Sequence, residues 1–575
     1  MVFKSLIKLP LFSQLTSYNR SLFVSDAVAG LVTAFISIPQ SMAYSNLAGL
    51  PPEYGLYCSL LPLMLYALLG SSRTLVVGPA ALISLMIAST IDKLSPSSVT
   101  ETIEYAVNLS LLTGFFLCFL SLLRLGNASH YISKPVITGF TSAAAIIIAV
   151  SQLPLLLGVE NDRSFNISDA LLQPEVYFSG INVVVIGVSL LGFVILWLSR
   201  NLPSFLIRFC VVPTVVRQGI VRLGPIVAII ISSAIVAVYS LDSNYGVDVV
   251  GAIPSSLPSF SVGFIKPSLW LELAMPAVSM ALICFLNSIA VTKSLASKRH
   301  ELIDANQELL ALGVANVGSA LTGTFSLAGS LSRSLVNYYA GARTQVANII
   351  SAAIILLTVL FFTPLLYFLP QAVLGVIVIA SVLPMVGVDK ILHYWSINKA
   401  DAVSLSITFA AVLMLGVDRG IWIGIGCSMV LLIHRTSKPH IAVVGRVQGG
   451  TSFRNSEKLD VETLNNSVFL RIDESLYFAN VQHVEDYILN YCSNRPSLRH
   501  IVIIFSSVNF IDGSALETCE RLVVSLRSSG LTLHLCEVKG IVHDQLKKTN
   551  LLTLLEPGKV FYSADEAMQY IESLQ

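Results

Sequence analysis

Residues 76–81, VVGPAA, and residues 325–333, FSLAGSLSR, are two apolar stretches, each broken by a glycine, that lie about 250 residues apart. Each leads into a short run, residues 82–88 in the first half of the chain and residues 334–339 in the second. Broken apolar segments at matching places in two halves are typical of a transporter built from inverted repeats, with its site near the middle of the membrane. The half-helix N-termini would offer free backbone N–H groups and a positive dipole end, so we expect an anion between them.

The second stretch ends on Arg333, and residues 326–339 contain no acid that could neutralise it. A charge inside a membrane is costly, which makes such an arginine a candidate functional residue. Its guanidinium stays charged and presents five donors in a fixed fork, which suits oxyanions. We therefore predict that Arg333 attracts the anion. The alternatives are a pair with a distant carboxylate such as Glu53, or a side chain that extends to the membrane interface.

The composition is that of a membrane protein. The 575 residues have a mean hydropathy of +0.76, and only 12% are charged, against about 25% in soluble proteins. About fourteen apolar segments have spanning or half-spanning length. We place them at residues 26–45, 54–70, 78–91, 105–125, 134–157, 181–199, 222–241, 270–292, 305–320, 329–340, 344–363, 371–387, 400–416 and 418–434.

Several function classes are disfavoured. The net charge of +1 gives no signal of nucleic-acid binding, and the eight cysteines and nine histidines show no metal-ligand spacing, so we expect no metal and no cofactor. No nucleophile–base arrangement or phosphate-binding loop is apparent, so an enzyme is not expected. The N-terminal region shows no signal-peptide cleavage site.

Basic residues indicate the orientation in the membrane, since cytoplasmic loops are enriched in lysine and arginine. Together with a basic N-terminus, they predict a plasma (inner) membrane protein with both termini in the cytoplasm. The enriched positions are Arg200, Arg208, Arg217 and Arg222 in one loop, and His434, Arg435 and Lys438 after the last segment.

After about Lys438 the charged fraction rises towards that of soluble proteins. Strand and helix patterns then alternate, which predicts a small α/β domain of about 135 residues. The expected strands are residues 467–472, 476–478, 501–505 and 531–536, and the expected helices are residues 481–491, 514–527, 541–547 and 564–573.

Several motifs resemble those of the sulfate permease (SulP) family of anion transporters, which is related to the multifunctional anion exchangers and prestin. They are residues 38–44 (IPQSMAY), 47–57 (LAGLPPEYGLY), 70–73 with Gly78-Pro79, 304–309 (DANQEL), 325–334 and 341–345 (GARTQ). Residues 508–512 (VNFID), Leu516 and residues 538–540 (VKG) resemble a STAS domain. The resemblance covers nearly the whole chain.

The resemblance implies a multi-pass α-helical membrane domain, residues 1–436, of two intertwined seven-helix inverted repeats, followed by a cytoplasmic STAS domain, residues 437–575. A core domain would comprise about residues 20–130 and 265–363, and a gate domain about residues 131–264 and 364–436. It further implies secondary active transport by elevator-like alternating access in a lipid bilayer, and a homodimer. Implied substrates are small anions: sulfate nominally, or chloride, bicarbonate, oxalate or dicarboxylates. Coupling to H⁺ or Na⁺ and a cytoplasmic protein partner of the STAS domain remain open.

Gly78 and Pro79 begin the first half-helix. A proline at a first helical position wastes no N–H group, and small residues let an anion approach the backbone. We expect the N–H groups of Ala80 and Ala81 to bind the anion; the alternative is a tight packing turn.

Four polar side chains join this candidate site. Ser330 and Ser332 could cap the second half-helix or bind the anion, and the resemblance favours Ser332 as a contact. Gln40 and Tyr44 are four residues apart and share one helix face. The resemblance places both beside the anion; the alternatives are a buried structural amide and an interfacial aromatic.

Asn287 stands where many bacterial relatives have glutamate, and the resemblance makes it a substrate-site residue. An asparagine cannot titrate, which favours anion exchange or an anion leak over proton symport at this position. Asp26 and Glu53 are the other candidates for coupling. Asp304 is predicted to cap its helix, with Gln307 at capping-box spacing.

Ser514 occupies a place where related anti-sigma-factor antagonists carry a phosphorylated serine, so it is a candidate regulatory residue; the alternative is a turn and helix cap. Three other functions stay open: an uncoupled anion channel, a prestin-like motor, and a signalling scaffold based on the STAS domain. A nucleobase permease is less favoured, because this site offers a cation instead of acids.

Overall fold

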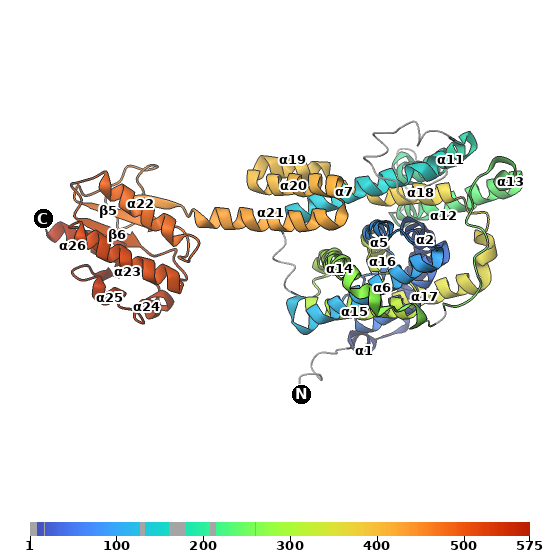
Figure 1. The fold of residues 1–575 in the computed structure, drawn as a ribbon, viewed down its shortest axis with the longest axis horizontal. Coiled ribbons are helices and arrows are strands. Elements are labelled where there is room, and N and C mark those ends of the chain that lie inside the picture. Colours follow the sequence, from blue (N-terminus) through green and yellow to red (C-terminus); the bar gives the residue numbers. More distant parts are fainter. Residues whose placement is uncertain are drawn as a thin grey trace. The chain divides into compact units, whose positions relative to one another are not determined.

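The structure is a computed structural model that describes residues 9–16, 18–126, 133–159, 180–206, 214–258, 260 and 262–574 (Figure 1). Three of the predicted cytoplasmic positions are affected: Arg208 lies outside the described residues, and so do the side chains of Arg217 and Arg222. The chain divides into two compact units, Met1–Gly426 and Cys427–Gln575. The division falls within the last apolar helix, whereas the sequence analysis places it at the end of that helix.

Eight of the described helices are long and apolar enough to cross a membrane, and shorter helices lie between them. The chain is therefore a multi-pass helical membrane protein with a smaller α/β unit at its C-terminus. The helices of the first unit are α1 (Pro10–Leu15), α2 (Arg20–Leu47), α3 (Pro52–Tyr57), α4 (Leu61–Leu69), α5 (Ala81–Leu94), α6 (Val99–Leu122), α7 (Lys134–Ser151), α8 (Leu153–Leu157), α11 (Val183–Leu206), α12 (Thr214–Tyr239), α13 (Leu241–Tyr245), α14 (Trp270–Arg299), α15 (Ala305–Leu321), α16 (Leu331–Tyr339), α17 (Val346–Leu357), α18 (Gln371–Val382), α19 (Val388–Ile397), α20 (Lys399–Leu415) and α21 (Val417–Ser437).

Most predicted segments correspond to one of these helices, with two differences. The segment predicted at residues 54–70 is two helices, α3 and α4, and the second of them begins with a proline in its first turn. Helix α19 was not predicted, because its ten residues are too short and too mixed in polarity to stand out as a membrane segment.

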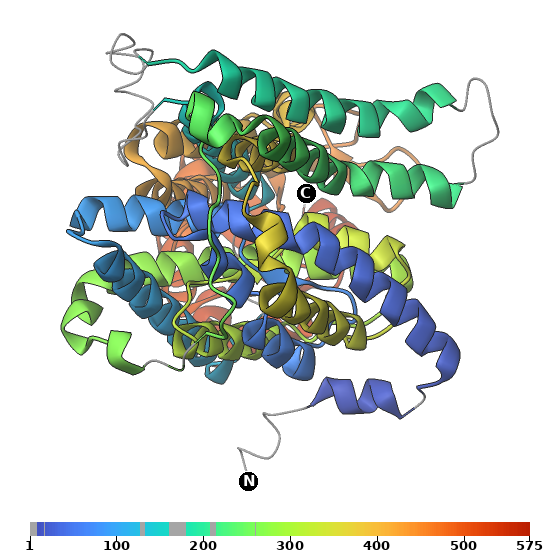
Figure 2. The ribbon, with the colours of Figure 1, turned by 90° about the vertical axis from the view of Figure 1, so that its right-hand side faces the viewer.

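The helices of the membrane unit form two groups. In the first helix group α2, α4, α5, α6, α14, α15, α16 and α17 pack together, and in the second α7, α8, α11, α12, α18, α19 and α20 do. Figures 1 and 2 show the groups as neighbouring layers, with α2 packed against α18 and α12 where the layers meet. Because the first group takes helices from both halves of the sequence, the two halves are intertwined, as the inverted-repeat fold requires.

Two short strands meet within the first helix group. Strand β1 (Val77–Gly78) pairs antiparallel with β2 (Ala328–Gly329). Each strand leads into a short helix, α5 or α16, and the antiparallel pairing sends these two helices away from the strands in opposite directions. The N-termini of two half-helices are thereby brought together in the interior of the membrane unit, as the sequence predicts.

Extended backbone inside a membrane needs internal hydrogen-bond partners, because lipid supplies none. Glu308 on α15 is fully buried and supplies several of them. Its carboxylate accepts the hydroxyl of Tyr66 at 2.7 Å, the N–H and hydroxyl of Ser71 at 2.8 and 2.7 Å, and the N–H of Ser72 at 2.9 Å. Asp304 caps the same helix, as predicted, by accepting two backbone N–H groups of its first turn at 3.0 and 3.2 Å.

Buried amide side chains form hydrogen bonds with further backbone groups of the two extended segments. Gln345 and Asn348 donate to the carbonyl of Leu75, at 3.3 and 2.7 Å, just before β1. Asn316 brackets Leu327 just before β2, accepting its N–H at 3.0 Å and donating to its carbonyl at 3.2 Å. These amide side chains therefore hold the backbone just before each strand in place through hydrogen bonds.

The second unit is built on a six-stranded sheet in the order β4-β3-β5-β6-β7-β8, with β5 to β8 parallel and β3 antiparallel to its two neighbours. Its predicted helices and three of its four predicted strands are confirmed. The predicted strand at residues 476–478 is wrong: only an isolated bridge joins Leu476 to Ile511. The elements are β3 (Ile441–Arg446), β4 (Phe453–Asn455), β5 (Ser467–Ile472), α22 (Val481–Ser493), β6 (His500–Ile504), α23 (Gly513–Ser528), β7 (Thr532–Cys536), α24 (Gly540–Leu546), α25 (Leu551–Leu554), β8 (Val560–Phe561) and α26 (Ala564–Ser573).

A pair of histidines lies between the sheet and α26. His534 on β7 is 1% exposed; its Nε2 lies 3.2 Å from Nδ1 of His500, and its Nδ1 accepts the N–H of Lys559 at 3.2 Å. Burial, followed by the neighbouring charges of His500 and Lys559, lowers the pKa of His534 to about 4. The imidazole is therefore held neutral.

We predict that the second unit loses stability as the pH falls from 6.5 to 4. An unfolded His534 binds a proton near pH 6.5, whereas the folded one resists protonation until about pH 4, so acid favours the unfolded state by up to about 3 kcal/mol. Chemical denaturation of residues 437–575 at several pH values measures this slope. His534→Gln should flatten it, and an unchanged slope in that variant would contradict the prediction.

Candidate anion-binding site

Arg333 lies in the first turn of α16 and is 1% exposed. One guanidinium nitrogen, Nη1, donates to the hydroxyl of Ser41 at 3.4 Å, and the other, Nη2, donates to the carbonyl of Pro79. Its Nε is buried and has no hydrogen-bond partner among the residues that the structure describes. In the described part of the chain no carboxylate comes within 4.0 Å of this guanidinium, so the expected alternative of a pair with Glu53 is absent there. The positive charge is held by neutral acceptors and is not cancelled.

Both half-helices begin without a side-chain cap. Ala80 precedes α5, and Ser330 precedes α16, where its hydroxyl lies 3.3 Å from that of Ser332 instead of bonding to the helix. The first N–H groups of a helix have no partner within the helix, so both termini keep donors for a ligand. Ala80 and Ala81 are 6% and 8% exposed, which places the first of these N–H groups in a nearly closed interior.

Gly78 allows the close approach of the two strands and the arginine. A β-carbon at this position would lie 2.8 Å from Nη1 of Arg333. The backbone of β1 thus passes directly beside the guanidinium, and the missing side chain leaves room for it.

Helix α2 contributes polar side chains in consecutive turns. Gln40 is 5% exposed, and its carbonyl oxygen has no hydrogen-bond partner among the described residues. Ser41, the next residue, contacts Arg333. Tyr44 is buried, and its hydroxyl lies 2.9 Å from that of Ser381 on α18, which belongs to the second helix group. One face of α2 therefore reaches both the arginine and the other group of helices.

Asn287 is half-buried on α14 and donates its amide to the carbonyl of Gly329 at 2.9 Å. Ser288, the next residue, accepts the N–H of the same glycine at 2.8 Å. The two side chains hold the end of β2, just before the N-terminus of α16. Asn287 is therefore next to the candidate site and supports its backbone.

Neither of the two acids proposed for coupling pairs with Arg333 in the described residues. Asp26 is fully buried and accepts the N–H groups of Arg343 and Thr344 at 2.6 and 3.1 Å, the hydroxyl of Thr344 at 2.6 Å and that of Tyr18 at 3.1 Å. It ties the start of α2 to the turn before α17. Glu53 is half-buried in the first turn of α3.

Ser514 is exposed at the start of α23 in the second unit. The cap of that helix is Asp512, whose carboxylate accepts the N–H of Ala515 at 2.8 Å. The alternative interpretation, that residues 512–514 form a turn and helix cap, is therefore confirmed, with Asp512 as the cap. The Ser514 hydroxyl forms no hydrogen bond within the described residues, and its regulatory role stays a prediction.

Sequence reasoning missed three parts of this site: the hydroxyl of Ser41, the carbonyl of Pro79 and the contact of Tyr44 with Ser381. Serines are frequent in membrane helices, and a backbone carbonyl has no sequence signal at all. Of the three, only the Ser41 hydroxyl could have been suggested by the sequence, because Ser41 directly follows the predicted site residue Gln40.

Comparisons with known proteins identify the family and the fold. A model of the sulfate permease family matches residues 23–408, and a model of the STAS domain matches residues 458–567. Sulfate transporter 4.1, chloroplastic, of Arabidopsis thaliana is 32% identical and covers 98% of this chain and 83% of its own length. Probable sulfate transporter 4.2 of the same plant is 33% identical, with 97% and 83% covered. The solved structure of murine Solute Carrier 26 family member A9, an anion transporter in the inward-facing state, has a TM-score of 0.90 at 22% identity over 100% of this chain and 95% of that one, which shows a shared fold.

We predict that Gly78→Ala weakens anion binding without unfolding the protein. The added methyl group would displace the Arg333 guanidinium, the charge on which binding depends, while β1 keeps its backbone partners. The measurement is the rise in melting temperature that sulfate causes in purified protein, which should fall by half or more. Gly187→Ala, at a glycine of α11 with open space around it and no positive φ, is the control for a glycine change as such. An equal sulfate response in Gly78→Ala and wild type would contradict the prediction.

Proposed function

The chain belongs to the sulfate permease family and carries a STAS domain, and we propose that it transports small anions, sulfate nominally, by alternating access around Arg333. Its relatives are named as transporters, so its activity is transport and not catalysis. The observation that carries the proposal is the buried guanidinium, without a carboxylate partner, beside two uncapped half-helix N-termini.

The charges of this site favour an anion but do little to determine which anion binds. One guanidinium and two positive dipole ends attract a negative charge, and the small side chains at Gly78, Ala80 and Ala81 leave the backbone accessible. Such a site selects by charge more than by shape, so bicarbonate, chloride and dicarboxylates are also compatible substrates.

The bond from Asn287 to the carbonyl of Gly329 bears on coupling. A glutamate at this position could make the same bond only when it is protonated, because a carboxylate has no donor. An asparagine makes the bond at every pH. This supports anion exchange over proton symport, and the engagement of Asp26 in four hydrogen bonds points the same way.

We propose further that the first helix group is the mobile core and the second is the gate. The core carries Arg333 and both half-helices, and sliding it along the gate would move the site across the membrane. The contact of Tyr44 with Ser381 crosses from α2 to α18 beside the site, so it has to break during such a movement.

Two polar contacts join α21 to the first helix group, and α21 itself packs against α20 of the second group, where β-carbons added at Gly420 and Gly424 would lie 2.5 Å from Val412 and 2.4 Å from Thr408. Lys93 in the last turn of α5 pairs with Asp418 in the first turn of α21 at 3.0 Å, and Trp422 donates to the hydroxyl of Ser279 on α14 at 2.8 Å. The opposite end of α21 leads to the STAS domain, which we propose lies in the cytoplasm. The contacts then close the outer side, as in an inward-facing state. We also propose a homodimer in the plasma membrane, with both termini in the cytoplasm.

Arg333→Ala should reduce labelled-sulfate uptake into proteoliposomes to the level of empty liposomes, because it removes the only buried cation among the described residues. Arg435→Ala removes an exposed arginine from α21 and should leave uptake unchanged. Both variants should elute as wild type in size-exclusion chromatography. Normal uptake by folded Arg333→Ala protein would remove the basis of the proposal.

Lys93→Gln or Asp418→Asn should open the outer side more often, since each removes one member of the ion pair between the groups. An exposed pair of this kind is worth about 1 kcal/mol or less, so the ratio of outward to inward states should rise about two- to fivefold. Distances between spin labels on α5 and α20 measure that ratio. Lys93→Asp combined with Asp418→Lys should restore it.

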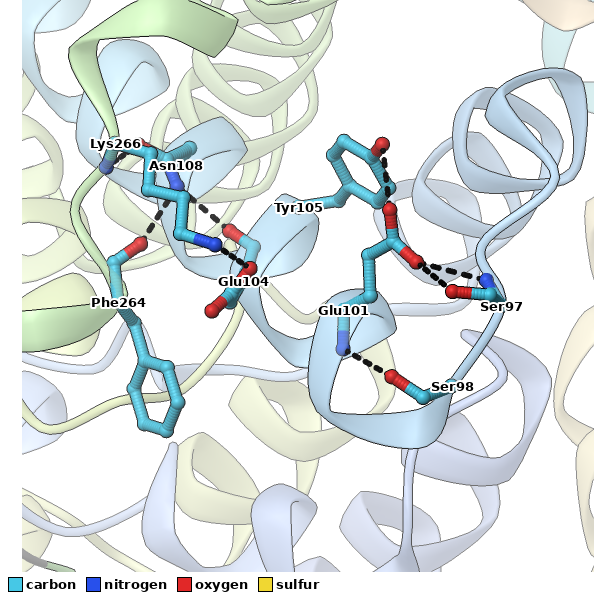
Figure 3. Close-up of polar contacts among 8 residues, drawn as sticks. All are labelled: Ser97, Ser98, Glu101, Glu104, Tyr105, Asn108, Phe264 and Lys266. Atoms are coloured by element: carbon cyan, nitrogen blue, oxygen red, sulfur yellow. Dashed lines mark hydrogen bonds and ion pairs between the residues drawn. The ribbon is translucent and has the colours of Figure 1, made fainter.

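A matched control is the pair of Lys266 and Glu104, 2.5 Å apart (Figure 3). Its side chains are 48% and 16% exposed, against 53% and 14% for Lys93 and Asp418. Both members belong to the first helix group or the segment leading into it, where Asn108 also binds the backbone of Lys266 at 3.0 Å. Lys266→Gln should leave the ratio unchanged. An equal shift in this control would contradict the assignment of the outer contact.

A further inference from the structure

Helix α14 exposes a polar face beyond Asn287. Ala290, Ser294 and Lys298 are exposed at intervals of four residues, and Lys298, eleven residues from Asn287, points almost the same way at 100° per residue. At the other end of the helix Leu271 is 92% exposed, about 100° to 180° around the axis from the residues of this face. A leucine suits lipid, whereas a face of small, polar and charged residues suits water, so the two faces border different surroundings.

Helix α16 packs against α14 and runs in the same direction, since Asn287 contacts Gly329 just before α16 and Lys298 contacts Tyr339 at its end. From Arg333 it runs six residues, about 9 Å, to its end at Tyr339, which is 49% exposed. Ser332 and Val336 are half-buried between the two ends. The partly open faces of α14 and α16 therefore lead from the candidate site to the same end of the first helix group.

Two cations are held where these faces end. The ammonium of Lys298 donates to the hydroxyl of Tyr339 at 3.3 Å and lies 5.5 Å from the centre of its ring. The guanidinium of Arg299 lies 4.5 Å above the ring of Tyr338, and the two rings meet edge to face at 5.1 Å. Neither cation has a carboxylate within 4.0 Å in the described residues. The nearest acid along the chain, Glu301, is within 3.9 Å of Arg73 instead.

We propose that Lys298 and Arg299 form a capture site for small anions at the cytoplasmic mouth of the path to Arg333, an inference that rests on the transport function proposed above. Aromatic rings hold the two cations in place and leave their charge uncancelled. A fixed positive charge at the mouth of a cleft raises the local concentration of anions and speeds their entry. The site selects for charge, and the anion passes from it to Arg333.

A simpler role has to be distinguished. Both cations lie in the last turn of α14, where a positive charge also stabilises the helix dipole. That role would affect the stability of the protein and the amount of active transporter, but it would not affect the anion concentration that half-saturates transport from one side.

The test is a charge series at Lys298, measured in inverted membrane vesicles, which present the cytoplasmic face to added labelled sulfate. Relative to wild type, the half-saturating sulfate concentration should rise about threefold in Lys298→Gln and about tenfold in Lys298→Glu, and stay within twofold in Lys298→Arg. Maximal rates should stay within twofold, and the effect should shrink at high ionic strength. Right-side-out vesicles should show no change.

Lys266→Gln is the matched control, since it removes one lysine charge from the segment just before the N-terminus of α14, opposite the helix end that carries Lys298. If the charge series leaves the half-saturating concentration unchanged while wild type transports sulfate, the capture site is wrong and the proposed function stands. If Lys298→Gln and Lys298→Glu lower only maximal rate and melting temperature, the cations serve the helix, and the capture site is again wrong. If wild type itself transports no sulfate or other small anion, both proposals fail together.

Discussion

The buried charge of Arg333 is the constraint on which the rest of the membrane unit depends. In the described residues it has no carboxylate partner; a hydroxyl and a backbone carbonyl hold the guanidinium in place without cancelling its charge. A charge kept in this way is costly unless something else compensates it. A mobile anion can do so, and the two uncapped helix N-termini next to it add donors for the same ligand.

This arrangement requires the backbone to leave the helix inside the membrane, and several buried polar side chains exist to permit that. Glu308 holds the segment before β1 by accepting hydrogen bonds from backbone N–H and hydroxyl groups. Asn316 holds the segment before β2 through hydrogen bonds with the N–H and the carbonyl of Leu327. Asn287 and Ser288 hold the end of β2. Among these buried polar residues, Arg333 is available to bind an anion, whereas the others form hydrogen bonds with the backbone of the broken segments.

The broken segments and Arg333 were predictable because glycine, proline and a lone charge are conspicuous in apolar sequence. The contacts that fix the arginine were not, since Ser41 resembles many other serines and the Pro79 carbonyl is present in every sequence. Asn287 was predicted at the site, but its bond to Gly329 depends on where α14 packs. In the second unit the strands β5, β6 and β7 were predicted from their apolar runs, whereas the short edge strands β4 and β8, with little buried surface, gave no such signal.

We propose that a second anion moving in the opposite direction, and not a proton, balances the transported one, because Arg333 is uncancelled in the described residues and the neighbouring Asn287 cannot titrate. The most direct test is labelled-sulfate uptake into proteoliposomes, with internal chloride or bicarbonate present or absent, and with or without an inward proton gradient. The account predicts uptake that requires an internal anion and does not respond to the proton gradient. Uptake driven by the proton gradient into liposomes without an internal exchangeable anion would contradict it.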